Sequence, residues 1–220
     1  MIALAPPNVS VHFTRMVAQG AVGAHQGLEE RSREQIAHLS EDVRLLAMVR
    51  PRVIVLAHTA TSALLGKAGD AELVERMARE HGVPFVTAFG CVFAAFAHLG
   101  IKRVAFGTPY DAASTAKSKA HLEANGIEVV SHGNLENVKN IYDETAAHAR
   151  ELARRIDAPA AQAVYLSGLG MPTIAELEAM ERDLGKPVVS AAAAMMWNAL
   201  RIVGERAPIS GFGRLLGGAR

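Results

Sequence analysis

The chain contains two imperfect copies of one pattern, and this internal duplication restricts its fold more than any other feature. In residues 53–100 and again in residues 163–204, an apolar strand ends in a small polar loop, an amphipathic helix follows, and a second apolar strand comes after Gly-x-Pro. Strands rich in Val and Ile without strict alternation are typical of a parallel sheet that is covered on both faces. Alternating strands and helices form right-handed βαβ units. The sequence therefore predicts an α/β protein of two lobes, with one site in the cleft between them.

The order of the predicted elements agrees with this interpretation. Short strands are expected at residues 9–13, 53–57, 84–87, 103–107, 127–131, 163–167 and 187–190. Helices are expected at residues 27–49, 70–80, 91–99, 112–124, 143–155, 174–183 and 192–203. Residues 1–90 together with 191–220 are assigned to a first lobe, and residues 91–190 to a second.

The first lobe is expected to open with a shortened unit. The residues before the strand at 9–13 are too few for a complete strand and helix. Either Ile2–Ala5 is a strand stub with no helix after it, or the chain starts late.

The composition excludes several classes of protein. The chain has 23 Lys and Arg residues against 22 Asp and Glu residues, interspersed along its helices, so it lacks the basic surface of a nucleic-acid-binding protein. No apolar run approaches the roughly 18–20 residues that cross a bilayer, and the N-terminus has no signal-peptide pattern. We therefore expect a cytoplasmic protein that binds neither nucleic acid nor membranes.

The sequence also lacks the patterns of common cofactor sites. Its histidines are scattered without the spacing of metal ligands, which predicts no metal. No strand is followed by G-x-G-x-x-G, there is no P-loop, and we expect no cofactor. The single cysteine, Cys91, excludes an intramolecular disulfide, and its place on an apolar helix indicates a thiol in the core.

The two copies differ where chemistry is expected. Aligning them places His58 opposite Gly168, each at the C-terminal end of its strand. Ligands bind at the C-terminal ends of strands in open α/β sheets. A histidine there can act as a general acid or base near neutral pH, whereas glycine cannot. The alternative for His58 is a hydrogen-bonded loop residue without a chemical role.

Six segments together resemble the maleate isomerase and arylmalonate decarboxylase branch of the aspartate/glutamate racemase superfamily. They are VSVHFTRM (9–16), VIVLAHTATS (53–62), RVAFGTPYD (103–111), AVYLSGLGMPT (163–173), LGKPVVSAAAAMMWNALR (184–201) and GFGRLL (211–216). The resemblance implies two flavodoxin-like (Rossmann-like) lobes with parallel sheets, related by a pseudo-twofold axis, and a small carboxylate held between them. It also implies a homo-oligomer.

The same resemblance implies which residues form the site. Members of this branch use a cysteine thiol at one or both strand ends, but this chain has His58 and Gly168 there and so lacks both cysteines. Thiol-based racemisation or covalent isomerisation is therefore not expected, because glycine can neither attack nor deprotonate a substrate.

The residues expected to bind the carboxylate are Thr59, Tyr110, Asn140 and the loop Ser167, Gly168, Leu169 and Gly170, whose backbone N–H groups would act as donors. An asparagine of the opening loop in this branch could correspond to Asn8.

Each of these residues also has a simpler interpretation. Thr59 could cap the helix that follows it, Tyr110 could pack between the lobes, and Ser167 is more plausible as a structural residue than as a nucleophile.

Two functions remain open. The first is a cofactor-independent enzyme that acts on a small mono- or dicarboxylate through a carbanion or enolate-like intermediate, with His58 handling one proton transfer. A one-sided site of this kind favours decarboxylation, other lyase chemistry or isomerisation over racemisation. The second is a carboxylate-binding or accessory protein that has lost catalysis.

Overall fold

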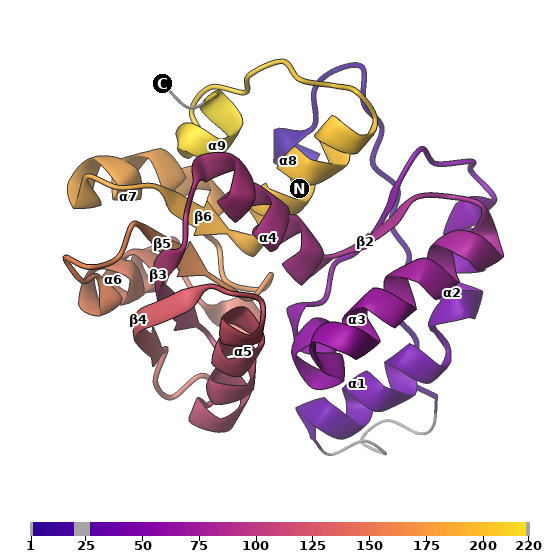
Figure 1. Ribbon diagram of the computed structural model, residues 1–220, viewed down its shortest axis with the longest axis horizontal. Helices are drawn as coiled ribbons and strands as arrows, with labels where there is room; N and C mark the ends of the chain where they lie inside the picture. Colours follow the sequence, from indigo (N-terminus) through magenta and orange to yellow (C-terminus); the bar gives the residue numbers. More distant parts are fainter. Residues whose placement is uncertain (1, 20–26, 219–220) are drawn as a thin grey trace.

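The computed structural model describes residues 2–19 and 27–218, whose strands form two parallel sheets (Figure 1). The smaller sheet pairs β1 (Ile54–Leu56) with β2 (Phe85–Thr87). The larger sheet has the order β4-β3-β5-β6, with all neighbours parallel. Its strands are β3 (Arg103–Thr108), β4 (Glu128–Asn134), β5 (Ala163–Leu166) and β6 (Val188–Ser190). The predicted two-lobed α/β architecture with parallel sheets is confirmed.

Helices cover both sheets. Those associated with the smaller sheet are α1 (Leu28–Ala37), α2 (Leu39–Ala47) and α3 (Thr59–His81). The others are α4 (Ala88–Leu99), α5 (Ala112–Ala124), α6 (Ala146–Ile156), α7 (Leu177–Leu184), α8 (Ala191–Ile202) and α9 (Gly213–Gly217). Short 3-10 turns lie at η1 (Ile2–Leu4), η2 (Ile141–Asp143) and η3 (Ile174–Glu176).

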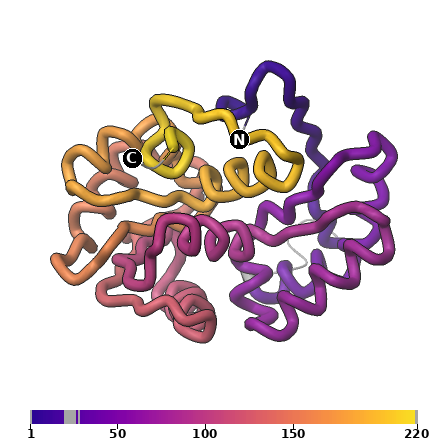
Figure 2. The backbone as a smooth tube through the Cα atoms, turned by 45° about the horizontal axis from the view of Figure 1, so that its top comes forward, coloured from indigo at the N-terminus to yellow at the C-terminus, as the bar shows by residue number. Residues whose placement is uncertain are grey.

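The sequence duplication has a direct structural counterpart at the ends of β2 and β6. Each strand ends in a hydroxyl residue that caps the next helix. The Oγ1 atom of Thr87 accepts the N–H of Gly90 (3.1 Å), and Oγ of Ser190 accepts the N–H of Ala193 (3.2 Å). The two capped helices, α4 and α8, are apolar and lie side by side in the middle of the molecule (Figures 1 and 2).

The buried apolar side chains form two clusters of unequal size. The smaller one lies around β1 and β2 and consists of Leu39, Val43, Ile54, Leu56, Leu73, Met77 and Phe85. The larger one surrounds β3–β6 and includes buried residues of both α4 and α8. The lobe boundaries expected from the sequence (1–90 with 191–220, and 91–190) stay a prediction. The buried side chains of α8, which was assigned to the first lobe, pack in the larger cluster together with residues assigned to the second.

The prediction of a strand at residues 9–13 is wrong. This segment makes no strand pairing with described residues, and Phe13 is 61% exposed. Its Val9 and Val11 instead pack against the larger core, which explains the alternating apolar pattern without a strand. Ile2–Leu4 is likewise a 3-10 turn rather than a strand stub, with Leu4 buried.

Two helices also differ from their predicted bounds. The helix expected at 70–80 begins at Thr59, and Gly66 (φ 68°, ψ −177°) breaks it into two pieces. The helix expected at 27–49 is divided into α1 and α2 at His38. None of the helices in the described part of the chain combines the length and apolarity that would let it cross a membrane.

Candidate active site

The C-terminal ends of β1, β3 and β5 meet between the two lobes. Thr59 follows β1, and its Oγ1 lies 3.3 Å from the hydroxyl oxygen of Tyr110, which follows β3. Gly168 follows β5, and a Cβ atom built on it would lie 3.6 Å from the same Tyr110 oxygen. The structure therefore brings together three of the residues expected to bind a carboxylate, one from each of three strand ends.

Tyr110 is a hydrogen-bond donor at neutral pH. Burial raises the pKa of its phenol above the ordinary value, the hydrogen bond with Thr59 lowers it, and nearby Tyr142 raises it further. The phenol consequently keeps its proton, and its O–H can be donated to an anion.

His58 occupies the turn between β1 and α3. Its backbone is extended (φ −145°, ψ 98°), and its Nδ1 lies 2.8 Å from Oγ1 of Thr61, which fixes the orientation of the ring. Burial lowers the pKa of the imidazole, and the positive charge of Arg31 on α1 lowers it further. The ring is therefore mainly neutral at pH 7 and can exchange a proton through Nε2. The tautomer of the ring depends on whether the Thr61 hydroxyl donates to Nδ1 or accepts from it.

The loop after β5 has no room for side chains at two positions. Gly168 has φ +91°, and a Cβ on it would lie 2.6 Å from Cδ and Cγ of Pro109. At Gly170 a Cβ would lie 2.6 Å from Cγ1 of Ile141. The absence of a side chain lets the β5 loop approach the loop after β3 at Gly168 and η2 at Gly170.

The N–H groups of the β5 loop differ in what they can offer a ligand. The N–H of Ser167 donates to the carbonyl of Gly107 (2.8 Å), because the β3–β5 pairing continues one residue past the strand. The expectation that Ser167 supplies a backbone donor is therefore wrong. The N–H groups of Gly168, Leu169 and Gly170 make no hydrogen bond with other described residues and remain available.

Two asparagines were expected at the site. Asn140 is exposed, and its Oδ1 accepts the N–H of Tyr142 (3.2 Å) as the cap of η2, so only its amide N–H groups remain for a ligand. Its place in a carboxylate site stays a prediction. Asn8 lies elsewhere, because its side chain donates to Glu205 (3.1 Å) and is exposed.

The structure adds two residues that the sequence motifs did not indicate. Arg31 on α1 acts electrostatically on His58, and Tyr142 in η2 acts on Tyr110. Both lie outside the strand-end loops, far in sequence from the residues they affect. Neither has a spacing signal that could have identified it.

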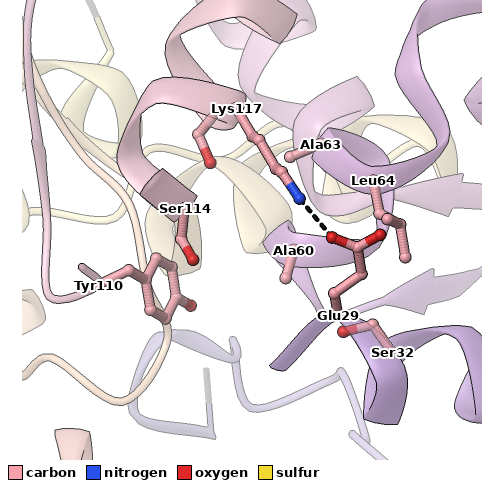
Figure 3. A pocket seen from close by; sticks show the side chains of 9 residues that line it. Glu29, Ser32, Ala60, Ala63, Leu64, Tyr110, Ser114 and Lys117 are labelled. Carbon is pink, nitrogen blue, oxygen red and sulfur yellow. Dashed lines mark hydrogen bonds and ion pairs between the residues drawn. The ribbon is translucent and has the colours of Figure 1, made fainter. Parts of the chain in front are cut away.

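Two cavities border the cluster of strand ends. A groove of about 490 Å³ runs between residues 12–16 and the smaller sheet, and reaches Ala57 and Tyr142. A second cavity of about 40 Å³ is lined by Tyr110, with the small side chains of Ala60 and Ala63 in its wall (Figure 3). The groove therefore borders the end of β1, and the small cavity borders Tyr110 after β3.

The comparison with known families decides to which family the chain belongs. The model of the arylmalonate decarboxylase family matches residues 6–216, almost the whole chain. The chain belongs to the arylmalonate decarboxylase family.

Two named relatives of this family member are identical to it at a little over a quarter of the aligned residues. It is 28% identical over 187 residues to arylmalonate decarboxylase of Bordetella bronchiseptica, covering 82% of this chain and 77% of that protein. It is 27% identical over 152 residues to maleate isomerase of Alcaligenes faecalis, covering 67% of this chain and 60% of that protein. The matched region thus spans less than two thirds of the Alcaligenes enzyme.

Solved structures agree with this assignment. A crystal structure of arylmalonate decarboxylase superposes with a TM-score of 0.78 at 28% identity, covering 84% of this chain and 83% of that one. Maleate cis-trans isomerase of Nocardia farcinica, solved as a mutant with a covalently bound succinylcysteine intermediate, has a TM-score of 0.87 at 24% identity, covering 100% of this chain and 91% of that one. The latter likeness concerns the fold.

The only thiol of this family member is unsuited to covalent chemistry. Cys91 is completely buried in α4, and burial raises its pKa to about 12, with a smaller opposite effect from the 3.4 Å hydrogen bond that Asn198 donates to its sulfur. It therefore stays protonated and shielded from solvent. In the described ranges, no group of three or more His, Cys, Asp or Glu side chains is arranged to hold a metal ion.

Proposed function

We propose that this family member is a cofactor-independent enzyme that acts on a small mono- or dicarboxylate without a thiol nucleophile. The proposal rests chiefly on one observation: Thr59 and Tyr110 share a hydrogen bond next to Gly168, a position without a side chain. Membership of a family whose named relatives are decarboxylases and isomerases supports a reaction of that class.

The proposed site would bind a carboxylate with neutral donors. One carboxylate oxygen would accept from Thr59 and Tyr110, in place of their mutual hydrogen bond, and the other from the N–H groups of the β5 loop. Donors fixed in this way stabilise negative charge that develops during reaction, as in an enolate. Such a site favours decarboxylation, other lyase chemistry or isomerisation.

His58 is the proposed proton carrier. In isomerisation or elimination the neutral imidazole would take a proton from the substrate carbon. In decarboxylation the bond to the leaving carboxylate would break, its electron pair would remain as an enolate, and His58 would relay a proton from solvent to that carbon. General acid–base catalysis by a positioned side chain contributes typically 10²–10⁴-fold.

A turnover assay on three proteins tests this proposal. Wild type, His58→Ala and Cys91→Ala would be assayed against arylmalonates, maleate and related carboxylates. We expect His58→Ala to lose about 10²-fold or more in kcat and Cys91→Ala to retain activity. Equal activity of wild type and His58→Ala would contradict the role of His58, and inactivation by Cys91→Ala would contradict a thiol-free mechanism.

The second candidate is a carboxylate-binding protein without catalysis. The buried Cys91 and the side-chain-free position at Gly168 favour it, because both leave the site without a nucleophile. Thermal stabilisation of the wild type by a carboxylate that no protein in the assay converts would select this candidate.

A further inference from the structure

An ion pair joins the two lobes directly beside the candidate active site. Glu29 on α1 belongs to the side of the smaller sheet, and Lys117 on α5 to the side of the larger one. The ammonium of Lys117 contacts the Glu29 carboxylate, and Figure 3 shows the pair across the cavity that Tyr110 also lines. The contact thus lies on the lobe boundary and near a proposed carboxylate donor.

Two further polar contacts lie along the boundary between the smaller-sheet helices and α5 in the part of the chain that the structure describes. At one end, Thr59 at the start of α3 hydrogen-bonds Tyr110, just before α5. At the other, Lys67 of α3 donates to the carbonyl of Ala124 (3.4 Å) at the end of α5. The Thr59–Tyr110 hydrogen bond therefore requires α5 to lie close to the smaller-sheet helices, and the Glu29–Lys117 pair holds α5 in that position.

Helix α1 brings further groups to the site. Ser32 is buried and lines the cavity beside Tyr110, and Arg31 acts on His58. Because α1 is short, its position depends on what holds it against its neighbours. Glu29 stands in the first turn of α1 and binds Lys117, while Arg33 holds the same carboxylate at 2.8 Å.

We propose that the Glu29–Lys117 ion pair is a clamp that holds α1 and α5 together around the candidate site, so that Glu29 and Lys117 are positioning residues for Thr59, Tyr110 and His58. The expected effect of the clamp on turnover rests on the proposed function. Its expected effect on the geometry of the site does not.

The pair is half exposed, with 53% of the Lys117 side chain and 45% of the Glu29 side chain accessible. Exposed ion pairs contribute little by themselves and weaken in salt. The clamp therefore changes how tightly the site is assembled without determining whether the protein folds.

A double-mutant cycle tests the clamp. Glu29→Gln, Lys117→Met and the double variant each remove the pair, and a charge exchange is avoided because Arg33 would repel a lysine at position 29. We expect each single variant, and the double variant equally, to raise the pKa of His58 towards its ordinary value, measured by NMR titration without substrate. The reason is that α1 moves away, taking the charge of Arg31 with it and exposing the imidazole.

Ligand binding gives a second readout. Each variant should weaken binding of maleate, used as the probe, by about two- to five-fold. Raising the salt concentration to about 0.5 M should reduce the wild-type affinity by a similar factor, because salt screens an exposed ion pair. Lys119→Met is the matched control, because Lys119 lies on the same helix and pairs with Glu123 within it. It should leave both readouts unchanged.

Two results would overturn the clamp. One is an unchanged His58 pKa in both single variants. The other is an effect in the double variant equal to the sum of the two single effects, since independent residues add and a pair does not. Because the His58 titration needs no turnover, a protein that converts no substrate would refute the enzymatic proposal and leave the clamp to be decided by the titration.

Discussion

At the scale of single residues, the candidate site depends on a position that has no side chain. Gly168 combines a left-handed backbone (φ +91°) with contact against Pro109. Gly168→Ala should therefore lower the free energy of unfolding by about 1–3 kcal/mol from backbone strain and further because Pro109 must move, and it should weaken carboxylate binding.

Gly126→Ala is the control for this prediction. Gly126 has a similar backbone (φ +80°), but nothing lies within 4 Å of a Cβ built on it. Urea unfolding of both variants separates strain from contact. Equal losses of stability, with carboxylate binding unaffected in both, would show that Pro109 does not restrict this loop.

The duplication and the topology of a parallel sheet predicted His58 and Gly168 at strand ends, whereas Thr59 and Tyr110 were expected from the family resemblance. The structure brings Thr59, Tyr110 and Gly168 together. The sequence could not predict that the N–H of Ser167 is used by the sheet, which depends on where β5 stops pairing. The effect of Arg31 on His58 could not be predicted either, because it depends on how α1 packs.

At the scale of elements, the equivalent caps of α4 and α8 differ in one contact. Thr87 caps α4 and also donates a buried hydrogen bond to Asp70 (2.9 Å), whereas the Ser190 hydroxyl caps α8 and has no second partner among the residues that the structure describes. Ser190→Ala should cost about 0.5–2 kcal/mol of unfolding free energy. Thr87→Val should cost about 1–3 kcal/mol more, because it also leaves the Asp70 carboxylate without its donor. Chemical denaturation of both variants checks this, and equal costs would mean that the Asp70 contact contributes nothing.

Some element boundaries were predictable from a local signal and others were not. The expected helix ends at residues 99 and 183 lie within one residue of the ends of α4 and α7, where Gly100 and Gly185 have left-handed backbones. The expected start at residue 91 was wrong, because the cap Thr87 begins α4 at Ala88. The strand expected at 9–13 failed because Val9 and Val11 satisfy their apolar pattern by packing on the larger core. An alternating pattern reports burial and does not specify pairing.

At the scale of the whole molecule, stability should fall in mild acid. His121 is buried against Phe89 (ring centroids 4.8 Å apart), and neither ring nitrogen has a partner among the described residues. Burial lowers its pKa, with a smaller opposite effect from Asp70, and burial likewise lowers that of His58. The unfolded chain then binds more protons than the folded one, so stability is fully present above the ordinary histidine pKa of about 6.5 and is lost as pH falls below it.

A comparison of two pH values checks this prediction. The free energy of unfolding of the wild type should be lower at pH 5.5 than at pH 7.5, pH values chosen about one unit either side of the ordinary histidine pKa. His121→Phe keeps an aromatic ring against Phe89 and removes one titrating group, so its loss should be smaller. An unchanged pH dependence in His121→Phe would contradict the account of His121.

If the ends of β1, β3 and β5 form one carboxylate site, a crystal structure with bound maleate will show the ligand between them. We expect a carboxylate oxygen within about 2.7–3.2 Å of both Thr59 Oγ1 and the Tyr110 hydroxyl, beside Gly168. Maleate bound away from these residues, with the Thr59–Tyr110 hydrogen bond intact, would contradict it.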